Sequence, residues 1–287
     1  MMRKKPMLAQ NVGDYSRIKD EDWPLYVQPK LDGVRCVIQY DEEREFNGSG
    51  VVAYSRTGKE WKNIDHILSI LAPFFMKHPN IILDGELYNH ELKNDFEKII
   101  SLVRKTKPTE EDRLESREMV QFHCYDTIME HMPFEERNKF LQGWFPNLDW
   151  IRDVDTRMVY NTEEVEARHE DFLELGYEGS IIRKNESYEC KRSWTLMKVK
   201  DFSDAEATIV GFVEGKGKRK GTIGKFIAED KDGNMFGMPV MDKFDYLQKN
   251  FKEMQGWIGK IATFTYFERT KANSYRHPLF KCIRNYE

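Results

Sequence analysis

The run Lys30-Leu-Asp-Gly-Val-Arg35 constrains this chain more than any other segment, because it places an amine beside a carboxylate, a glycine turn and a guanidinium. A lysine amine has an ordinary pKa of about 10.4, so it attacks phosphorus only where its surroundings favour the neutral form or activate the target. Residues 23–27 and 34–40 have strand character on either side of the run. We therefore predict a β-hairpin whose tip, residues 31–33, holds Lys30 rigidly over a cleft.

By itself this motif is weak, since Asp-Gly is an ordinary turn pair and a lysine before it is usually a solvated charge. Five further short motifs follow downstream, and together they strengthen the interpretation of Lys30 as a catalytic residue. They are Ser55-Arg-Thr-Gly58, Asp84-Gly-Glu-Leu87, Phe122-His-Cys-Tyr-Asp126, Glu178-Gly-Ser-Ile-Ile182 and Leu196-Met-Lys-Val-Lys200.

These six ordered motifs resemble those of the covalent nucleotidyltransferase superfamily, and in particular the small two-domain ATP-dependent DNA ligases of viruses and phages. The resemblance covers residues 25–285, nearly the whole chain. It implies an α+β nucleotidyltransferase fold, ATP-grasp-like, with mixed and antiparallel sheets and helices, followed by an all-β OB-fold barrel. The two domains are expected at residues 1–201 and 202–287, the second binding DNA.

Hydrophobic periodicity agrees with this organisation. Helical spacing predicts helices over 64–75, 94–103, 134–141 and 163–175, the last closed by Gly176. Strands are predicted at 81–83, 120–125, 178–183 and 195–199. Beyond residue 205 the pattern becomes rich in strands, at 207–213, 223–228 and 258–267, with one helix at 243–254, as in a small oligonucleotide-binding barrel.

Composition and cysteine spacing constrain the class of protein and the compartment in which we expect it. Hydrophobic residues make up 40% and charged residues 33% of the 287 residues, which is ordinary for a globular protein, and no apolar run reaches a membrane-spanning length. The four cysteines show no C-x-x-C pair, and the amino terminus lacks an apolar signal-peptide core. We expect an intracellular monomer, cytoplasmic or nucleoid-associated, or acting in a host cell if viral, and not secreted.

The resemblance assigns catalytic roles residue by residue. Lys30 is the expected nucleophile, which attacks the α-phosphate of ATP, expels pyrophosphate and becomes a lysyl-AMP. Asp32 would help to position a metal or a sugar hydroxyl. Lys198 and Lys200 alternate on a strand, so both ammonium groups are expected to reach one phosphate.

The nucleotide and its metal ion are expected to meet a second set of residues. Tyr125 would stack on the base, opposite a wall made by Ile181 and Ile182. Glu86 would hydrogen-bond the ribose, and Glu178, together with Glu86, would bind Mg²⁺ or Mn²⁺. Gln28 stands where the family usually has a glutamate that faces adenine, and glutamine can both donate to and accept from a base edge.

The expected DNA contacts are cationic. Arg35 would contact the ribose or the 5′-phosphate, since a guanidinium suits oxygen-rich partners, and Arg56 would grip the 5′-phosphate at the nick. In the second domain a glycine-rich loop and two carboxy-terminal arginines are candidates: Lys216, Lys218, Arg219, Lys220, Arg276 and Arg284.

The charge balance fits this division, although the net charge of −4 by itself argues against a polyanionic partner. Residues 201–287 hold 15 Lys and Arg against 12 Asp and Glu, whereas residues 1–200 hold 30 against 37. The segment 214–225 carries five cations and one anion. A solvated hairpin is the alternative interpretation of that segment.

We therefore interpret the chain as an ATP-dependent DNA ligase that seals 5′-phosphate/3′-hydroxyl nicks in duplex DNA during replication, repair and recombination. An ATP-dependent RNA ligase, which would recognise 2′-hydroxyls, and an mRNA guanylyltransferase, which takes GTP, remain alternatives. A catalytically silent nucleic-acid-binding module is an alternative from another class. Two observations would distinguish these four functions. One is which nucleotide labels Lys30, and the other is which nicked strand, DNA or RNA, removes the label.

Overall fold

The computed structural model describes residues 4–12, 15–47, 49–93, 95–145, 149–200, 203–242, 244–266, 268–269 and 273–284. The chain divides into two compact units, Met1–Val199 and Lys200–Glu287. The predicted boundary between residues 201 and 202 lies outside the described residues and stays a prediction. Each unit has its own hydrophobic core.

The first unit contains two five-stranded sheets. The first sheet has the strand order β1-β10-β9-β2-β8 and is built from β1 (Leu8–Asn11), β2 (Leu25–Pro29), β8 (Arg157–Val159), β9 (Ser180–Arg183) and β10 (Arg192–Val199). The second sheet has the order β4-β3-β5-β6-β7, from β3 (Val34–Tyr40), β4 (Val51–Tyr54), β5 (Ile82–Tyr88), β6 (Gln121–Thr127) and β7 (Ile151–Asp153). Pairing is antiparallel except between β1 and β10 and between β6 and β7, as expected for a mixed fold.

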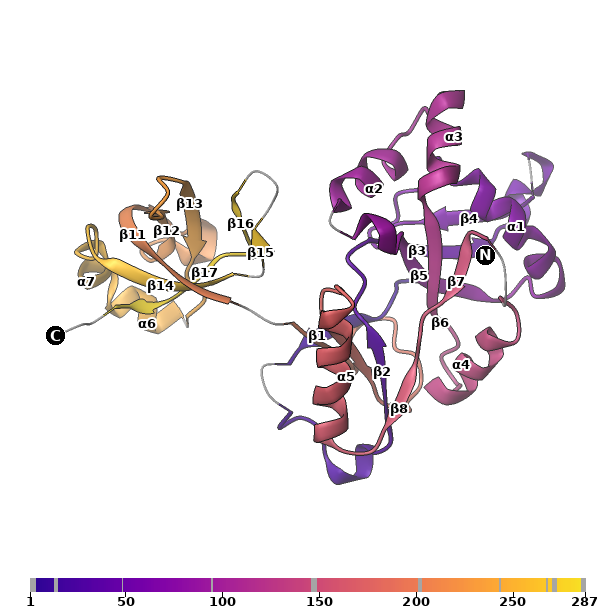
Figure 1. Ribbon diagram of the computed structural model, residues 1–287, viewed down its shortest axis with the longest axis horizontal. Helices are drawn as coiled ribbons and strands as arrows, with labels where there is room; N and C mark the ends of the chain where they lie inside the picture. Colours follow the sequence, from indigo (N-terminus) through magenta and orange to yellow (C-terminus); the bar gives the residue numbers. More distant parts are fainter. Residues whose placement is uncertain are drawn as a thin grey trace. The chain divides into compact units, whose positions relative to one another are not determined.

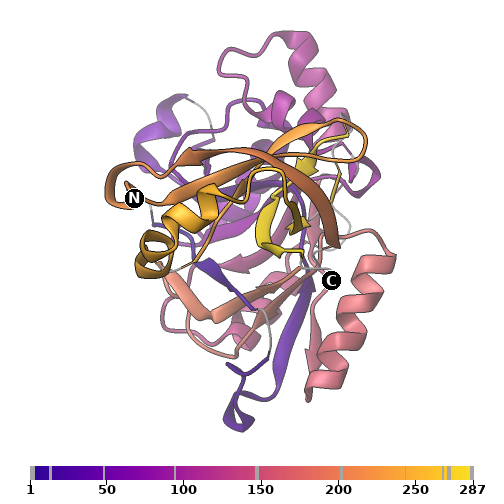
Figure 2. The ribbon, with the colours of Figure 1, turned by 90° about the vertical axis from the view of Figure 1, so that its left-hand side faces the viewer.

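Five α-helices cover these sheets (Figure 1). They are α1 (Asp65–Lys77), α2 (Phe96–Val103), α3 (Glu110–Met119), α4 (Phe134–Gln142) and α5 (Thr162–Glu174), with short 3₁₀ turns at Asp20–Asp22, Glu42–Asn47 and His90–Leu92. α5 lies along the first sheet (Figure 1 and Figure 2) and packs Val165 and Phe172 onto its strands. α1 packs Ile67, Leu71 and Phe75 into the core of the second sheet.

Local sequence explains where two of these helices begin. The Asn161 side chain accepts a hydrogen bond from the Glu164 amide at 2.8 Å, which caps the first turn of α5, and Gly176 with φ +86° follows its end. Thr109 and Asp112 form a reciprocal capping box at the start of α3. Our helix predictions did not include α3, because its strongly polar face hides the apolar period.

The second unit is a five-stranded antiparallel sheet with the order β13-β12-β11-β14-β17. Its strands are β11 (Ser203–Glu214), β12 (Ile223–Glu229), β13 (Met235–Pro239), β14 (Ile261–Tyr266) and β17 (Leu279–Ile283), with a small pair β15 (Glu268–Arg269) and β16 (Tyr275–Arg276). The predicted single helix is two short ones, α6 (Phe244–Lys249) and α7 (Phe251–Gln255), and a 3₁₀ turn spans Gly217–Arg219. Figure 2 shows the long strands of this unit, in orange, running side by side.

The starts that we predicted at Asn94 and Lys243, and the strand end at Phe267, lie outside the described residues. Among the described residues no helix has the length and apolar character needed to cross a bilayer. Cys36, Cys124, Cys190 and Cys282 are free thiols in the structure.

Candidate active site

Lys30 stands where the chain leaves one sheet and enters the other. β2 belongs to the first sheet and β3 to the second, so the predicted hairpin is wrong: residues 31–33 form a crossover between sheets. The strand character of the two segments could not distinguish these arrangements, because both need two strands joined by a short turn. A crossover places the amine at the junction of two sheets instead of on a free tip.

Backbone hydrogen bonds fix Lys30 against the segment that carries Glu178. The Lys30 amide donates to the Gly179 carbonyl at 2.8 Å, and the Glu178 amide donates to the Lys30 carbonyl at 3.1 Å. The ammonium of Lys30 forms an ion pair with the Glu178 carboxylate, which is almost fully buried. Two motifs that lie 148 residues apart in sequence are thus joined by both main chain and side chain.

Gly33 allows the crossover to approach β5 closely. A Cβ at this position would lie 2.5 Å from the Leu87 carbonyl oxygen and 2.7 Å from Cγ of Glu86. Such contacts are too short for any side chain, so only glycine fits. The glycine of the first motif is therefore required by packing against the Asp-Gly-Glu-Leu motif.

Beside Lys30 lies a pocket of about 230 Å³ whose lining is strongly cationic. It contains one carboxylate, Glu86, and the aromatic side chain of Tyr125, together with six cations from five different segments: Lys30, Arg35, Arg56, Arg183, Arg192 and Lys198. Burial lowers the pKa of Lys198, and the nearby charges of Lys30, Arg192 and Arg56 lower it further. A ligand with several negative charges, such as a nucleotide phosphate chain, suits this lining.

Glu86 and Tyr125 form one wall of the pocket. The Tyr125 hydroxyl donates to a carboxylate oxygen of Glu86 at 3.2 Å. Burial raises the pKa of the Glu86 carboxyl to about 7, although Arg35 and Lys30 favour its charged form. A pocket carboxyl with a pKa raised in this way is a candidate functional group.

Arg35 lines the pocket but is already held by a carboxylate. Its Nε donates to Asp84 Oδ1 at 2.6 Å, its Nη2 contacts the second Asp84 oxygen, and its guanidinium lies 5.1 Å from the centre of the Tyr125 ring. The Tyr188 hydroxyl also donates to Asp84, at 2.6 Å. Asp84 was quoted in its motif without a role, and the structure makes it the residue that orients Arg35.

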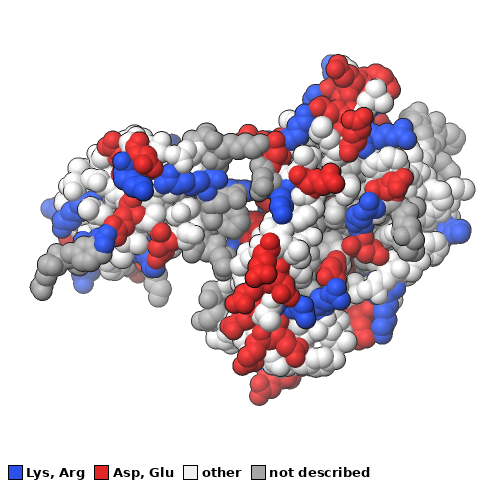
Figure 3. All heavy atoms as spheres, in the orientation of Figure 1, with Lys and Arg blue, Asp and Glu red and all other residues white. Residues whose placement is uncertain are grey.

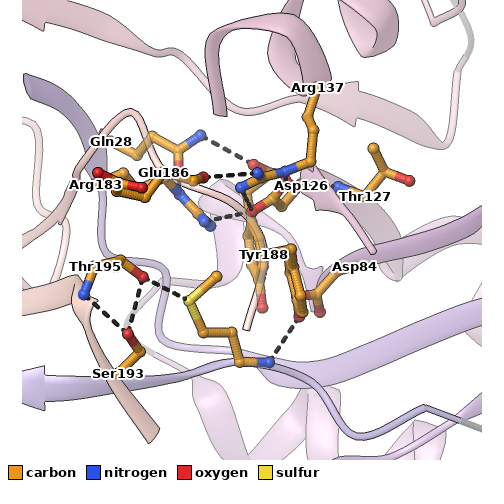
Figure 4. Close-up of polar contacts among 12 residues, drawn as sticks. Gln28, Asp84, Asp126, Thr127, Arg137, Arg183, Glu186, Tyr188, Ser193 and Thr195 are labelled. Atoms are coloured by element: carbon orange, nitrogen blue, oxygen red, sulfur yellow. Dashed lines mark hydrogen bonds and ion pairs between the residues drawn. The ribbon is translucent and has the colours of Figure 1, made fainter. Parts of the chain in front are cut away.

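A second buried network includes two residues that line the pocket, Gln28 and Arg183 (Figure 4). Asp126 is fully buried and accepts from Arg137 Nε at 2.7 Å and from Arg183 Nη1 at 2.6 Å. Arg183 Nε also donates to the Gln28 amide oxygen at 2.7 Å. The Gln28 amide nitrogen donates to Thr156 Oγ1 at 2.8 Å and to the Tyr125 carbonyl at 3.2 Å, so protein partners fix the orientation of this amide.

Strand alternation corrects the predicted wall of the base site. Ile181 lines the pocket, whereas Ile182 is fully buried in the core beneath the first sheet with Val27 and Met197. Successive side chains of a strand point to opposite faces, so Ile181 and Arg183 share the pocket face and Ile182 cannot. The same rule applied to β9 would have identified Arg183, which our sequence analysis missed.

The other predicted residues divide between the pocket and its surroundings. Arg56 is exposed at the pocket, on a turn closed by Gly58 with φ +90°. Lys198 lines the pocket from β10, whereas Lys200 lies beyond the end of that strand and is not part of the lining. Asp32 lies on the crossover, close enough to Tyr88 for its charge to raise the pKa of that hydroxyl together with burial.

Two carboxylates were predicted to bind a divalent cation. Among the residues that the structure describes, no three His, Cys, Asp or Glu side chains converge as a complete ligand set. Glu178 contacts Lys30, and Glu86 lies close enough for its charge to interact with that of Lys30. Mg²⁺ can be held by one or two carboxylates when substrate phosphate and water complete its shell, so the metal role of Glu86 and Glu178 stays a prediction.

In the second unit, the predicted cations lie on exposed loops and strand ends. Lys216, Lys218 and Lys220 are exposed around the turn between β11 and β12, where Arg219 donates to the Asp242 carbonyl at 3.1 Å. Arg284 forms an ion pair with Glu206. Arg276 ends β16 and is half-buried.

Comparison with known proteins adds independent findings. Residues 6–200 match the family model described as the ATP dependent DNA ligase domain, and residues 214–284 match that of the DNA ligase OB-like domain. A DNA ligase of African swine fever virus is 30% identical over 230 residues, which cover 76% of this chain and 52% of the viral protein. The DNA ligase of phage T4 is 23% identical over 80% of this chain and 55% of its own length.

The chain spans about half the length of these relatives. Among solved structures, one of a Lig E DNA ligase has a TM-score of 0.74 at 24% identity and covers 99% of this chain and 100% of its own. The ATP-dependent DNA ligase of bacteriophage T7, in complex with ATP, has a TM-score of 0.56 at 20% identity, with 98% of both chains covered. These likenesses confirm the predicted fold, a nucleotidyltransferase unit followed by an OB-like unit.

Proposed function

Because the chain belongs to the ATP-dependent DNA ligase family, we propose that it seals 5′-phosphate/3′-hydroxyl nicks in duplex DNA through a lysyl-AMP on Lys30. The observation that carries the proposal is the position of Lys30, hydrogen-bonded to the Glu178–Gly179 segment at the edge of a cationic pocket. Roles in replication, repair and recombination, and action as a monomer, are part of the same proposal.

The proposed first step joins Lys30 to the nucleotide. The Lys30 ammonium first loses a proton to solvent, and the neutral amine attacks the α-phosphorus of ATP. A P–N bond forms, the P–O bond to pyrophosphate breaks, and a second proton leaves the nitrogen to solvent. Arg56, Arg192 and Lys198 are available to bind the phosphates, and Tyr125 presents an aromatic face and Glu86 a carboxylate in the same pocket. A bound Mg²⁺ on Glu178 and Glu86 would neutralise charge on the phosphate.

Two further transfers complete the proposed reaction. The 5′-phosphate at the nick attacks the lysyl-AMP phosphorus, which breaks the P–N bond and gives an adenylated 5′ end. The 3′-hydroxyl then attacks the 5′-phosphorus, the new phosphodiester forms, and AMP leaves. Exposed Arg56 and the Lys216–Lys220 loop are the proposed contacts to the DNA backbone.

The test is a labelling and chase experiment on the full chain. We expect α-labelled ATP, but not GTP, to label the protein, and a nicked DNA duplex to discharge the label with formation of a sealed strand. Lys30→Arg keeps the positive charge and serves as the matched control, which should not be labelled. Labelling by GTP, or sealing of nicked RNA alone, would overturn the assignment in favour of a capping enzyme or an RNA ligase.

A further inference from the structure

An exposed tryptophan lies close to the cationic pocket, and no step described above uses it. Trp194 has 41% of its surface exposed and lies on β10 two residues after Arg192, which lines the pocket. The guanidinium of Arg17 lies 5.1 Å from the centre of the Trp194 ring. A tryptophan presents a large flat face that can pack against another ring, and the guanidinium beside it can contact an anion.

The backbone around Trp194 is irregular in a way that turns this residue outward. β1 pairs with β10 at Ser193 and then at Met197, so the three residues between them have no partner on β1. The Ser193 hydroxyl is buried and accepts a hydrogen bond from the Thr195 amide at 3.0 Å. The hydrogen bond between Ser193 and Thr195 therefore stabilises the bulge, while Trp194 between them stays exposed.

The charges nearby define the kind of partner. Arg17 is exposed, and exposed Arg56 and Arg192 line the adjacent pocket. In contrast, acidic side chains gather over α5 on the same unit (Figure 3), where Glu163, Glu164, Glu166, Glu170, Asp171 and Glu174 are exposed. Charge therefore favours a polyanion at the pocket mouth, where Arg56 and Arg192 lie, over the acidic face of α5.

We propose that Trp194 and Arg17 form a contact surface for the nicked DNA duplex. Trp194 packs its exposed face against a sugar or base of the DNA, and Arg17 contacts a backbone phosphate nearby. This inference rests on the proposed function, because it names residues that hold the substrate of the same site. Base-stacking aromatics combined with cations are a recurring way to hold a nucleic-acid strand.

The experiment measures the affinity of the full chain for a nicked duplex that ends in a 3′-deoxy nucleotide and cannot be sealed. We expect Trp194→Ala to weaken binding roughly tenfold without changing the salt dependence, and Trp194→Phe to retain most of the affinity. Arg17→Ala should lower the slope of log affinity against log salt by about one. ATP labelling of Lys30 without DNA should be unchanged in all three variants.

Matched controls come from the same unit. Arg117 lies 5.1 Å from the Trp150 ring, an equivalent pair away from the pocket, and Tyr160 is an aromatic residue with 60% of its surface exposed. Arg117→Ala and Tyr160→Ala should leave nick affinity unchanged. If Trp194→Ala and Arg17→Ala bind like these controls while wild-type labelling is normal, the contact surface is overturned and the proposed function stands.

Two other outcomes have defined meanings. Absence of labelling in the wild type would overturn the proposed function itself. If Trp194→Ala does not fold, Trp194→Phe and Arg17→Ala still decide the matter: an unchanged salt slope in Arg17→Ala contradicts the proposal, and a slope reduced by about one supports it.

Discussion

Two arginines of the pocket and the lysines of the Lys216–Lys220 loop differ in how the protein holds them. In the first unit, Arg35 and Arg183 are bound by the buried carboxylates of Asp84 and Asp126. In the second unit, Lys216, Lys218 and Lys220 extend into solvent from a glycine-rich turn. On the proposed function this difference has a physical reason, because attack on a phosphorus atom requires fixed geometry, whereas attraction to a polyanion requires only charge.

The largest difference in stability between the two regions should appear when a carboxylate that pairs with the arginines is removed. Asp126→Ala leaves Arg137 and Arg183 buried without their counter-ion, and we expect it to lower the free energy of unfolding by about 3–5 kcal/mol. Asp204→Ala is the matched control in the second unit, because the Asp204–Lys281 pair is exposed and is worth at most about 1 kcal/mol. Urea unfolding of both variants measures the contrast, and equal losses would contradict it.

A smaller effect should follow from Glu86, whose pKa is about 7 in the folded protein against an ordinary value of 4.5. A carboxyl with a raised folded pKa contributes stability below its unfolded pKa and loses it as pH rises through the folded value. Glu86→Gln should therefore gain stability relative to the wild type between pH 5 and pH 8, by on the order of 1–3 kcal/mol.

Thermal unfolding of wild type and Glu86→Gln across that pH range measures this gain. Glu60→Gln, which makes the same substitution at a part-exposed carboxylate paired with Arg44, is the matched control. A constant difference between wild type and Glu86→Gln at all pH values would show that Glu86 ionises normally.

The smallest effect on stability should come from the loop. Lys218→Ala and Lys220→Ala remove exposed charges, so we expect changes below about 0.5 kcal/mol in the free energy of unfolding. Each should nevertheless reduce the salt dependence of nick binding by about 0.9 in slope, if the side chain contacts a phosphate. Binding titrations at several salt concentrations test this, and an unchanged slope in both variants would remove the loop from the DNA contacts.

Much of the fold was predictable because many of its elements have a pattern of apolar residues within their own segment of sequence. α1, α4 and α5 follow apolar spacing, and the resemblance of six ordered motifs implied the order of the two units. α3 was missed because it buries few apolar side chains, although its capping box between Thr109 and Asp112 is visible in the sequence. The pairing of β2 and β3 was wrong because alternation reports which face of a strand is buried and not which sheet it joins.

The residues of the candidate site also fall into two groups, those that the sequence predicted and those that only the structure showed. Residues inside short motifs, such as Lys30, Glu86 and Tyr125, were found because those motifs keep their order and approximate spacing. Asp84 and Asp126 were quoted without a role, because their function depends on Arg35, Arg137 and Arg183, which reach them from distant segments. Ion pairs between distant segments leave no local pattern, and only the fold reveals them.

The most direct test of the account is the site of adenylation in the intact protein. After incubation with ATP and Mg²⁺, mass spectrometry of the protein and its peptides should show one added adenylate, carried by the peptide that contains Lys30 and absent from Lys30→Arg. An adenylate on another residue, or an unmodified protein that still seals nicked DNA, would contradict the assignment of Lys30 as nucleophile.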